Sequence, residues 1–401
     1  MKKLLFFAIG LSLSPMLWAS PLSPDEALSR ALESQNGMKH ISVSDKIELS
    51  FTQKHDGKPM IYMFSRGTDK GFYAVAADDN TAPLLGFCDT GTLPSSAEQL
   101  PDGMRYWLET LSEQAALNVT YGKKYSKAKA PTNKWQIDPL CQTRWNQNSP
   151  YNDLCPVNSK GARSVTGCVA TAMSQVMKYY NYPERIIAGH EYVTKTLNQT
   201  LSIKENTAFD WNNMLDTYTS EATDAEKTAV ATLMFACGVS VDMNYSPSAS
   251  GAVTRNAMGA FITNFGYDKG IQWHTRDYYT LTEWEDLMFD NLAKYGPILY
   301  SGQSNDGGHA FVCDGYLNGY FHFNWGWGGM SDLFPYDRTR SRFPGHRRQH
   351  IRLQLRPGCH DTRIERTDIR ELLPIDFILA RRLDVGYRHT QRYRHDTYDR
   401  L

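Results

Sequence analysis

Several residue patterns that mark common classes of protein are missing from this sequence. No CxxC pair occurs in its 401 residues, and no HxxxH pair occurs before residue 333, so the spacings fit no zinc site. Residues 1–332 hold 27 lysines and arginines against 34 aspartates and glutamates, and this acidic excess leaves no basic face for nucleic acid. We therefore expect neither a metal site nor a nucleic-acid partner.

Long apolar runs are absent after the first twenty residues, which argues against a transmembrane helix. The first twenty read MKKLLFFAIGLSLSPMLWAS: a lysine pair, an apolar run and then small residues. This order is typical of a secretory signal peptide, and we expect its removal after Ala19. The mature chain should then be secreted, periplasmic or on the cell surface.

Cysteine is scarce and its count is odd. The seven cysteines stand at positions 88, 141, 155, 168, 237, 313 and 359. In an exported protein an odd count leaves at least one thiol unpaired, or paired between chains. One of these thiols is therefore a candidate for chemistry.

Lysine disappears from the end of the chain. Residues 1–332 contain 19 lysines and 8 arginines, whereas residues 333–401 contain 16 arginines and no lysine. Selection for positive charge would use both residue types, so this bias indicates a property of the coding frame. We hypothesise that residues 333–401 are translated out of the native reading frame; the alternative is an Arg-rich tail that binds acidic surfaces. The tail shows no sustained hydrophobic period, and we expect it to pack poorly.

The rest of the chain divides at residues 121–134, a lysine-rich stretch without large aliphatic residues. It is either a plain surface loop or a processing site between domains. In residues 20–129, helices are expected in ALSRALESQ and DGMRYWLETLSEQAAL, and strands in GFYAVAADD and PLLGFCDTG. Residues 130–332 pass from helices (TGCVATAMSQVMKYY, TAVATLMFACGV) to short strands (GPILYSG, HAFVCDGY, YFHFNW), which predicts an α+β domain with two lobes.

Cys168 lies where a buried helix is expected to begin. Apolar residues recur on one face of SVTGCVATAMSQVMKYYNYP, and Thr166 and Gly167 stand where an N-cap would. The amides and dipole at a helix N-terminus favour a thiolate, and a neighbouring imidazolium lowers the thiol pKa further. A lone helical cysteine is more often a small core residue, so its partner decides the interpretation.

His309 is the candidate partner. It follows Gly307 and Gly308, which let a substrate backbone approach closely, and it begins the strand HAFVCDGY. It stands 141 residues after Cys168. The Cys and His of papain-like proteases are separated by about 130–150 residues. His322, by contrast, stands among aromatic residues and is expected to pack.

Two further segments carry polar groups suited to acyl transfer. Gln147, in the loop QTRWNQNSPYND, can donate its amide to an oxyanion together with the backbone N–H of Cys168. In NWGWGG, Asn324 can accept a hydrogen bond from His309, and Trp325 can shield that bond from water. Each residue alone also has a plainer interpretation, as a solvated loop residue or part of a core-filling turn.

Together these motifs resemble the streptopain family of secreted bacterial cysteine proteases. The matching stretches run from about residue 20 to 332 in the family's order: GFYAVAADDNTAPLLGFCDTG, WNQNSPYN, TGCVATAMSQVMKYYNYP, DMNYSPSASGA, GGHAFVCDGY and NWGWGGMSD. The resemblance implies a papain-like two-lobed catalytic domain at 130–332 behind an α+β inhibitory propeptide at 20–129. It also implies self-processing in the 121–134 linker, and neither a metal nor an organic cofactor.

The resemblance implies roles for individual residues as well. Cys168 is the nucleophile and His309 the general base and acid. Gln147 and the Cys168 amide form the oxyanion hole, while Asn324 and Trp325 orient His309. The substrate cleft is expected to hold Tyr245, Ser248, Gly251, Gly307, Gly308 and Trp327. The implied partners are protein and peptide substrates, with the chain's own propeptide as inhibitor.

Two other functions stay open on the sequence. An adhesin or haemagglutinin on an inactive protease fold is one, because the altered C-terminal end replaces strands with which the family completes the lobe around His309. A transglutaminase-like acyl transferase is the other, since it would use the same Cys–His chemistry. The recognisable propeptide favours the protease.

Overall fold

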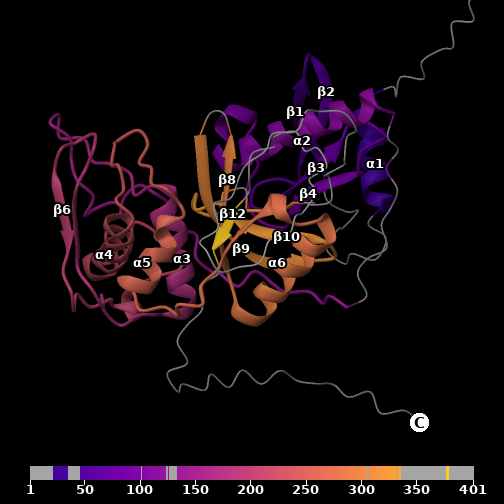
Figure 1. Cartoon of the computed structure of the whole chain (residues 1–401). Helices are drawn as coiled ribbons and strands as arrows, with labels where there is room; N and C mark the ends of the chain where they lie inside the picture. The colour runs from indigo at the N-terminus through magenta and orange to yellow at the C-terminus, as the bar shows by residue number, and fades with distance from the viewer. Residues whose placement is uncertain are drawn as a thin grey trace, which may run out of the picture. The chain divides into compact units, whose positions relative to one another are not determined.

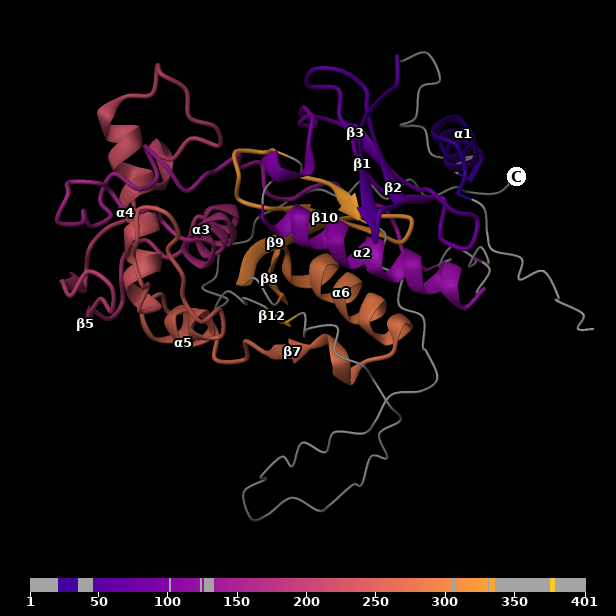
Figure 2. The same ribbon diagram turned by 90° about the horizontal axis from the view of Figure 1, so that it is seen from above.

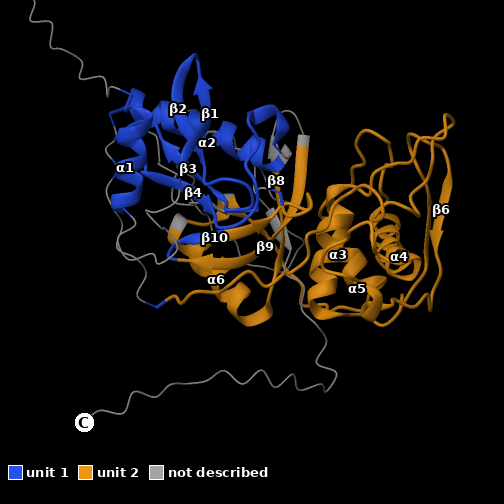
Figure 3. Cartoon of the chain, turned by 180° about the vertical axis from the view of Figure 1, so that it is seen from behind, with its two compact units in different colours: residues 1–133, 318–321, 330–369 blue, residues 134–317, 322–329, 370–401 orange. Residues whose placement is uncertain are grey.

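The computed structural model (Figure 1; turned view in Figure 2) describes residues 21–34, 46–100, 102–122, 125, 133–304, 307–330, 332–335 and 376–378. The predicted signal peptide, most of the 121–134 linker and most of the 333–401 tail lie outside these residues. Figure 3 colours two compact units. Unit 1 comprises residues 1–133, 318–321 and 330–369, and unit 2 comprises residues 134–317, 322–329 and 370–401.

Unit 1 is built on an antiparallel sheet with the strand order β1-β2-β3-β4-β11. The strands are β1 (Glu48–His55), β2 (Lys58–Ser65), β3 (Phe72–Ala76), β4 (Leu84–Cys88) and β11 (Phe334–Pro335). β3 and β4 are buried along their whole length, in keeping with their unbroken apolar sequences FYAVA and LLGFC. Both strands were expected from the sequence and are confirmed.

Two helices pack on this sheet and confirm the sequence prediction. α1 (Pro24–Ser34) contacts β3 and β4, and α2 (Asp102–Thr120), preceded by the 3₁₀ turn η1 (Ala97–Gln99), contacts β1 and β2. α1 buries Ala27 and Ala31, which are four residues apart and so share one face. Its Arg30 donates a hydrogen bond of 2.8 Å to the carbonyl of Asp78.

The first part of unit 2 is mainly helical. Its elements are α3 (Cys168–Tyr180), β5 (His190–Val193), β6 (Thr200–Ile203), η2 (Trp211–Asn213), α4 (Asp224–Ser240) and α5 (Asn256–Thr263). α3 and α4, both predicted, pack against each other and share the apolar core of the unit. The Thr223–Glu226 capping box starts α4. No helix among the described residues is long and apolar enough to span a membrane.

The second part of unit 2 is a sheet with the strand order β10-β9-β8-β12-β7. Its elements are β7 (Trp273–Thr275), η3 (Arg276–Tyr278), α6 (Leu281–Tyr295), β8 (Ile298–Ser304), β9 (Gly307–Leu317), β10 (Tyr320–Asn324) and β12 (Asp376–Ile378). α3 packs against β8 and β9, so the helical part meets the sheet at this helix (Figure 1). This is the α+β, two-lobed architecture expected from the sequence.

One short stretch of the Arg-rich tail forms regular structure. β12 pairs antiparallel with β8 on one side and with β7 on the other. Phe and Ile in this stretch are residue types that favour a strand. The hypothesis about the reading frame concerns residues that lie mostly outside the described chain.

The first residues of unit 2 are fastened to β9. Ile137 and Tyr316 exchange two backbone hydrogen bonds of 2.8 Å. The N–H of Cys141 donates to the carboxylate of Asp314 at 2.9 Å, and that fully buried carboxylate also bonds Nδ1 of His322 at 2.6 Å. The half-buried His322 ring, which was expected to pack among aromatic residues, is thus held by a buried carboxylate.

Candidate active site

Cys168 is the first residue of α3. Gly167 occupies the N-cap with φ 86° and ψ 143°, a conformation that residues with a Cβ rarely adopt, and it supplies no side-chain cap. Cys168 itself is only half-buried, whereas Val169 and Ala170 after it are buried. The thiol thus lies at an accessible helix N-terminus, where the amides and the dipole favour its anion.

His309 is the third residue of β9, and its ring is held on two sides. Nε2 lies 3.1 Å from the carbonyl oxygen of Trp325. Because a carbonyl only accepts, Nε2 carries the hydrogen of this bond, and Nδ1 is left for the thiol. The ring also stacks on Phe311, with ring centres 6.1 Å apart, and on Trp327, at 6.2 Å. These contacts fix the imidazole's plane and tautomer.

Cys168 and His309 interact directly. Burial raises the pKa of the Cys168 thiol. The hydrogen bond and the charge of His309, together with backbone N–H groups of Ala310 and Val169, lower it by more, so the net pKa lies below that of an ordinary thiol. The arrangement favours a thiolate–imidazolium pair.

The other perturbed thiols contrast with Cys168. Burial raises the pKa of Cys88, Cys155 and Cys237 to about 12. The six cysteines in the described part of the chain form no disulfide. Of these four thiols, only Cys168 has the combination of access and a cationic partner that makes a cysteine reactive.

Gln147 lies beside the start of α3. Its carbonyl accepts a hydrogen bond of 3.1 Å from the N–H of Thr166, two residues before Cys168. Its side chain is 7% exposed, and within the described residues its amide has no hydrogen-bond partner. Because this side-chain amide is not engaged by another group of the described chain, it is available to donate a hydrogen bond to a substrate oxygen.

Asn324 was predicted to accept a hydrogen bond from His309, and the structure gives it other partners. Its Nδ2 donates to the carbonyl of Thr143 at 2.8 Å, and its Oδ1 accepts from the N–H of Gly326 at 3.0 Å. The bond to the N–H two residues ahead is a local Asx turn, which the amide forms more readily than a long-range contact. The neighbouring carbonyl of Trp325, and not the Asn324 side chain, contacts the imidazole.

The six residues predicted to line the cleft differ in their placement. Ser248, Gly251 and Gly308 are exposed, Trp327 is half-buried against the His309 ring, and Gly307 begins β9. Tyr245 was predicted wrongly: its side chain is fully buried in the core of unit 2, and burial raises its pKa well above the ordinary value. An aromatic residue at the start of an irregular loop has no periodic neighbours to show which way it points.

The loop of residues 246–251 lies against the segment that leads to Cys168. The carbonyl of Ser246 accepts from the N–H of Val165 at 3.2 Å, and the hydroxyl of Ser250 donates to the carbonyl of Val165 at 2.7 Å. The loop is thereby held against the segment that leads to Cys168.

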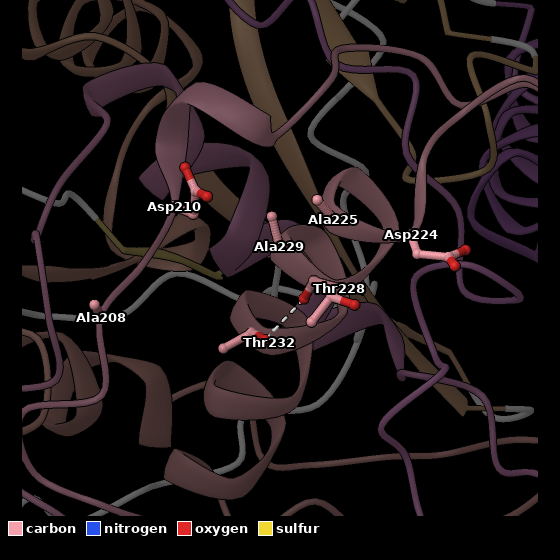
Figure 4. A pocket seen from close by; sticks show the side chains of 7 residues that line it. All are labelled: Ala208, Asp210, Asp224, Ala225, Thr228, Ala229 and Thr232. Carbon is pink, nitrogen blue, oxygen red and sulfur yellow. Dashed lines mark hydrogen bonds between the residues drawn. The ribbon is translucent and has the colours of Figure 1, made fainter.

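A separate hollow lies over the first turns of α4 (Figure 4). It is lined by Ala208, Asp210, Asp224, Ala225, Thr228, Ala229 and Thr232. Asp210 caps η2, and the Thr232 hydroxyl donates to the carbonyl of Thr228 at 2.7 Å. None of the predicted site residues lines this hollow, so it is not part of the active site.

Sequence reasoning missed two buried polar side chains of unit 2. The hydroxyl of Thr143 donates to Oε1 of Gln175 at 3.0 Å, and the two residues are 3% and 0% exposed. Gln175 stands seven residues after Cys168, about two turns along α3. A glutamine one residue before Val176 and Met177, in a helix buried from Val169 to Met177, was the available signal.

Comparison with known proteins assigns a family. A profile described as "Peptidase C10 family" matches residues 145–334, and one described as "Spi protease inhibitor" matches residues 19–115. Streptopain of Streptococcus pyogenes is 33% identical over 293 residues, which cover 68% of this chain and 72% of streptopain. The thiol protease/hemagglutinin PrtT of Porphyromonas gingivalis is 31% identical over 354 residues, 82% of this chain and 40% of PrtT.

A solved structure shows the same architecture. A mutant fragment of prointerpain A from Prevotella intermedia matches with a TM-score of 0.64 and 34% identity, over 74% of this chain and 93% of the fragment. That fragment comes from a proenzyme, prointerpain A, and here the inhibitor profile likewise precedes the peptidase profile. The chain therefore belongs to the streptopain family, peptidase family C10, and is a cysteine peptidase with a propeptide.

Proposed function

We propose that Cys168 is the nucleophile and His309 the general base and acid for hydrolysis of peptide bonds in protein substrates. The observation that carries this proposal is the lowered pKa of the Cys168 thiol beside His309. The thiolate attacks the peptide carbonyl carbon, and the imidazolium gives its proton to the leaving amine. The neutral imidazole then takes a proton from water, whose oxygen attacks the acyl-enzyme; the acid leaves and the thiolate is restored.

The oxyanion that forms on the carbonyl oxygen needs donors in fixed positions. We assign this role to the Gln147 side-chain amide and the backbone N–H of Cys168. The free amide of Gln147, its burial and its backbone bond to Thr166 support the assignment. The carbonyl of Trp325 keeps Nε2–H of His309 engaged, so that Nδ1 faces the thiol throughout the cycle.

Residues 20–129 are proposed to be the inhibitory propeptide of the catalytic domain at 130–332. The inhibitor profile at 19–115 supports an inhibitory segment in this part of the chain, and the lysine-rich composition of residues 121–134 suits a cut by the enzyme itself. The N-terminal pattern of a lysine pair, an apolar run and small residues supports export, with removal of the first 19 residues.

Residues 333–401 are proposed to be out of the native frame. Every arginine codon has G as its second base, so reading that starts one base later converts each arginine to Val, Ala, Asp, Glu or Gly. The 16 arginines would vanish together, and the peptidase profile stops at residue 334, close to where they begin. Resequencing the 3′ end of the gene tests the proposal; an uninterrupted frame and a matching intact mass would refute it.

Hemagglutination, which the name of PrtT includes besides thiol protease activity, is the weaker candidate function for this chain. The chain covers only 40% of PrtT, and no feature of its described residues favours adhesion over hydrolysis. The contact between Cys168 and His309 supports peptide hydrolysis.

Alkylation tests the proposed function. Iodoacetamide should label Cys168, as read by peptide mass spectrometry, and should abolish hydrolysis of a denatured protein. Cys168→Ala should be inactive and should keep its propeptide. Cys88→Ala is the matched control: its buried thiol lies in unit 1, and the processed enzyme should be active. Hydrolysis that survives Cys168→Ala, or amine incorporation that outpaces hydrolysis, would refute the proposal.

A further inference from the structure

A chain of buried polar groups runs behind the active site from α3 to the turn after β10. We call it the polar bridge and define it as Gln175, Thr143, Asn324 and the N–H of Gly326. Oε1 of Gln175 accepts from the Thr143 hydroxyl at 3.0 Å, and the Thr143 carbonyl accepts from Nδ2 of Asn324 at 2.8 Å. Oδ1 of Asn324 accepts from the N–H of Gly326 at 3.0 Å. The three side chains are 0 to 3% exposed.

One end of the polar bridge positions the Trp325 carbonyl, which holds the His309 ring. Asn324 bonds the N–H of Gly326 across Trp325 and anchors the turn to the Thr143 carbonyl, so it helps to set where the Trp325 carbonyl points. That carbonyl contacts Nε2 of His309 at 3.1 Å. Gly326 closes the turn with φ 74°, and a Cβ there would lie 2.9 Å from Cγ2 of Thr171 on α3. The turn therefore sits directly on the helix that carries the nucleophile.

The other end lies on that same helix. Gln175 is two turns after Cys168, and its Nε2 is buried without a hydrogen-bond partner among the described residues. An apolar side chain of similar size would avoid this cost, so a structural explanation for the amide is incomplete. The bond from Thr143 to Gln175 links α3 to the irregular segment before it and, through Asn324, to the His309 turn.

We infer that Gln175 and Thr143 are positioning residues that hold His309 in register with Cys168 by fixing the Trp325 carbonyl. The inference rests on the proposed roles of Cys168 and His309. Loss of the link lets the carbonyl shift, which weakens its bond to the imidazolium. Turnover then falls, while the substrate contacts that set KM stay in place.

Thr143→Val tests this directly, because it removes the hydroxyl and keeps the branched shape. We expect kcat to fall about fivefold to tenfold, as for one lost internal hydrogen bond, with KM within about twofold. The acidic limb of the pH profile for Cys168 alkylation should move to higher pH. Thr143→Ser, which restores the hydroxyl, should recover both readouts.

Thr232→Val is the matched control, since it deletes a threonine hydroxyl on α4 that bonds only within its own helix. It should leave kcat and the alkylation profile unchanged. Gln175→Met is the second variant, used where Thr143→Val fails to fold, and it should reproduce the loss of kcat.

The outcomes distinguish a failure of the proposed function from a failure of the positioning role. If iodoacetamide labels another cysteine in the wild type, the proposed function fails. If Cys168 is labelled and either folded variant keeps the wild-type kcat and alkylation profile, the positioning role alone is overturned. A fall in kcat that Thr143→Ser does not recover, or that comes with an unchanged pH profile, also overturns it, because a merely structural role predicts that pattern.

Discussion

Gly167→Ala adds one methyl group, and it should distort the start of α3 where the proposed catalytic residue Cys168 lies. Gly167 has φ 86°, and a Cβ there would lie 2.6 Å from Sδ of Met243 and 3.0 Å from the carbonyl oxygen of Ser250. Met243 is fully buried, so its sulfur has little room to move. The peptide that follows Gly167 carries the N–H of Cys168, one of the two proposed oxyanion donors.

The Gly167→Ala substitution should lower the stability of the folded state in two ways. Placing an alanine in the backbone conformation of Gly167, at φ 86° and ψ 143°, costs about 1–3 kcal/mol, and forcing a methyl group into a packed core costs about 1–3 kcal/mol. We therefore expect the free energy of unfolding to fall by about 2–6 kcal/mol. Relief of the strain rotates the Gly167–Cys168 peptide and withdraws its N–H, which should lower kcat about 10²–10³-fold, as for one oxyanion donor.

Denaturant unfolding and steady-state kinetics on a denatured protein substrate measure both effects. Gly259→Ala is the matched control, because Gly259 lies in α5 and its added Cβ would meet no atom within 4 Å. That variant should gain up to about 1 kcal/mol in helix propensity and keep its kcat. A Gly167→Ala enzyme with the unfolding midpoint and kcat of the wild type would refute the reasoning.

Three further predictions concern side chains. Gln147→Ala should lower kcat about 10²–10³-fold with little change in KM; an unchanged kcat would exclude Gln147 from the oxyanion hole. In the wild type the thiol pKa is lowered, so alkylation of Cys168 should persist below pH 8.5, about the pKa of a free thiol. In His309→Ala only the desolvation and the amides are left, so the alkylation rate should fall at higher pH than in the wild type, and identical profiles would contradict the ion pair. Asp314→Ala removes the buried partner of His322 and should cost about 3–5 kcal/mol in chemical denaturation, whereas a loss under about 1 kcal/mol would mean that the pair is weak.

Local patterns in the sequence pointed to Cys168 and His309, the two candidate residues that the structure brings into contact. Cys168 follows a glycine at the start of an apolar helical period, and His309 follows two glycines at the start of a strand. Both places are defined by residues within a few positions, so one stretch of sequence contains the information. The strands FYAVA and LLGFC and the helices α1 to α4 were predicted for the same reason.

Contacts between distant segments account for what the sequence did not show. Thr143 and Gln175 are 32 residues apart, and nothing near either one indicates the hydrogen bond that joins them. Asn324 was assigned to the imidazole because its chemistry fits, yet a backbone N–H two residues away competes for the same oxygen. The inward direction of Tyr245 depends on the core around it, which only the packed structure defines.

The contacts of the first residues of unit 2 affect how the enzyme can be produced without its propeptide. Lys134 bonds Asp286 on α6, Trp135 packs edge-on against Phe289 of that helix at 4.9 Å, and Cys141 binds Asp314. A recombinant chain that starts at or before Lys134 keeps all of these contacts. A recombinant chain that starts after Cys141 leaves backbone groups of β9 without their hydrogen-bond partners and removes the Trp135 ring that packs on α6. This shorter chain should be recovered mainly as insoluble protein.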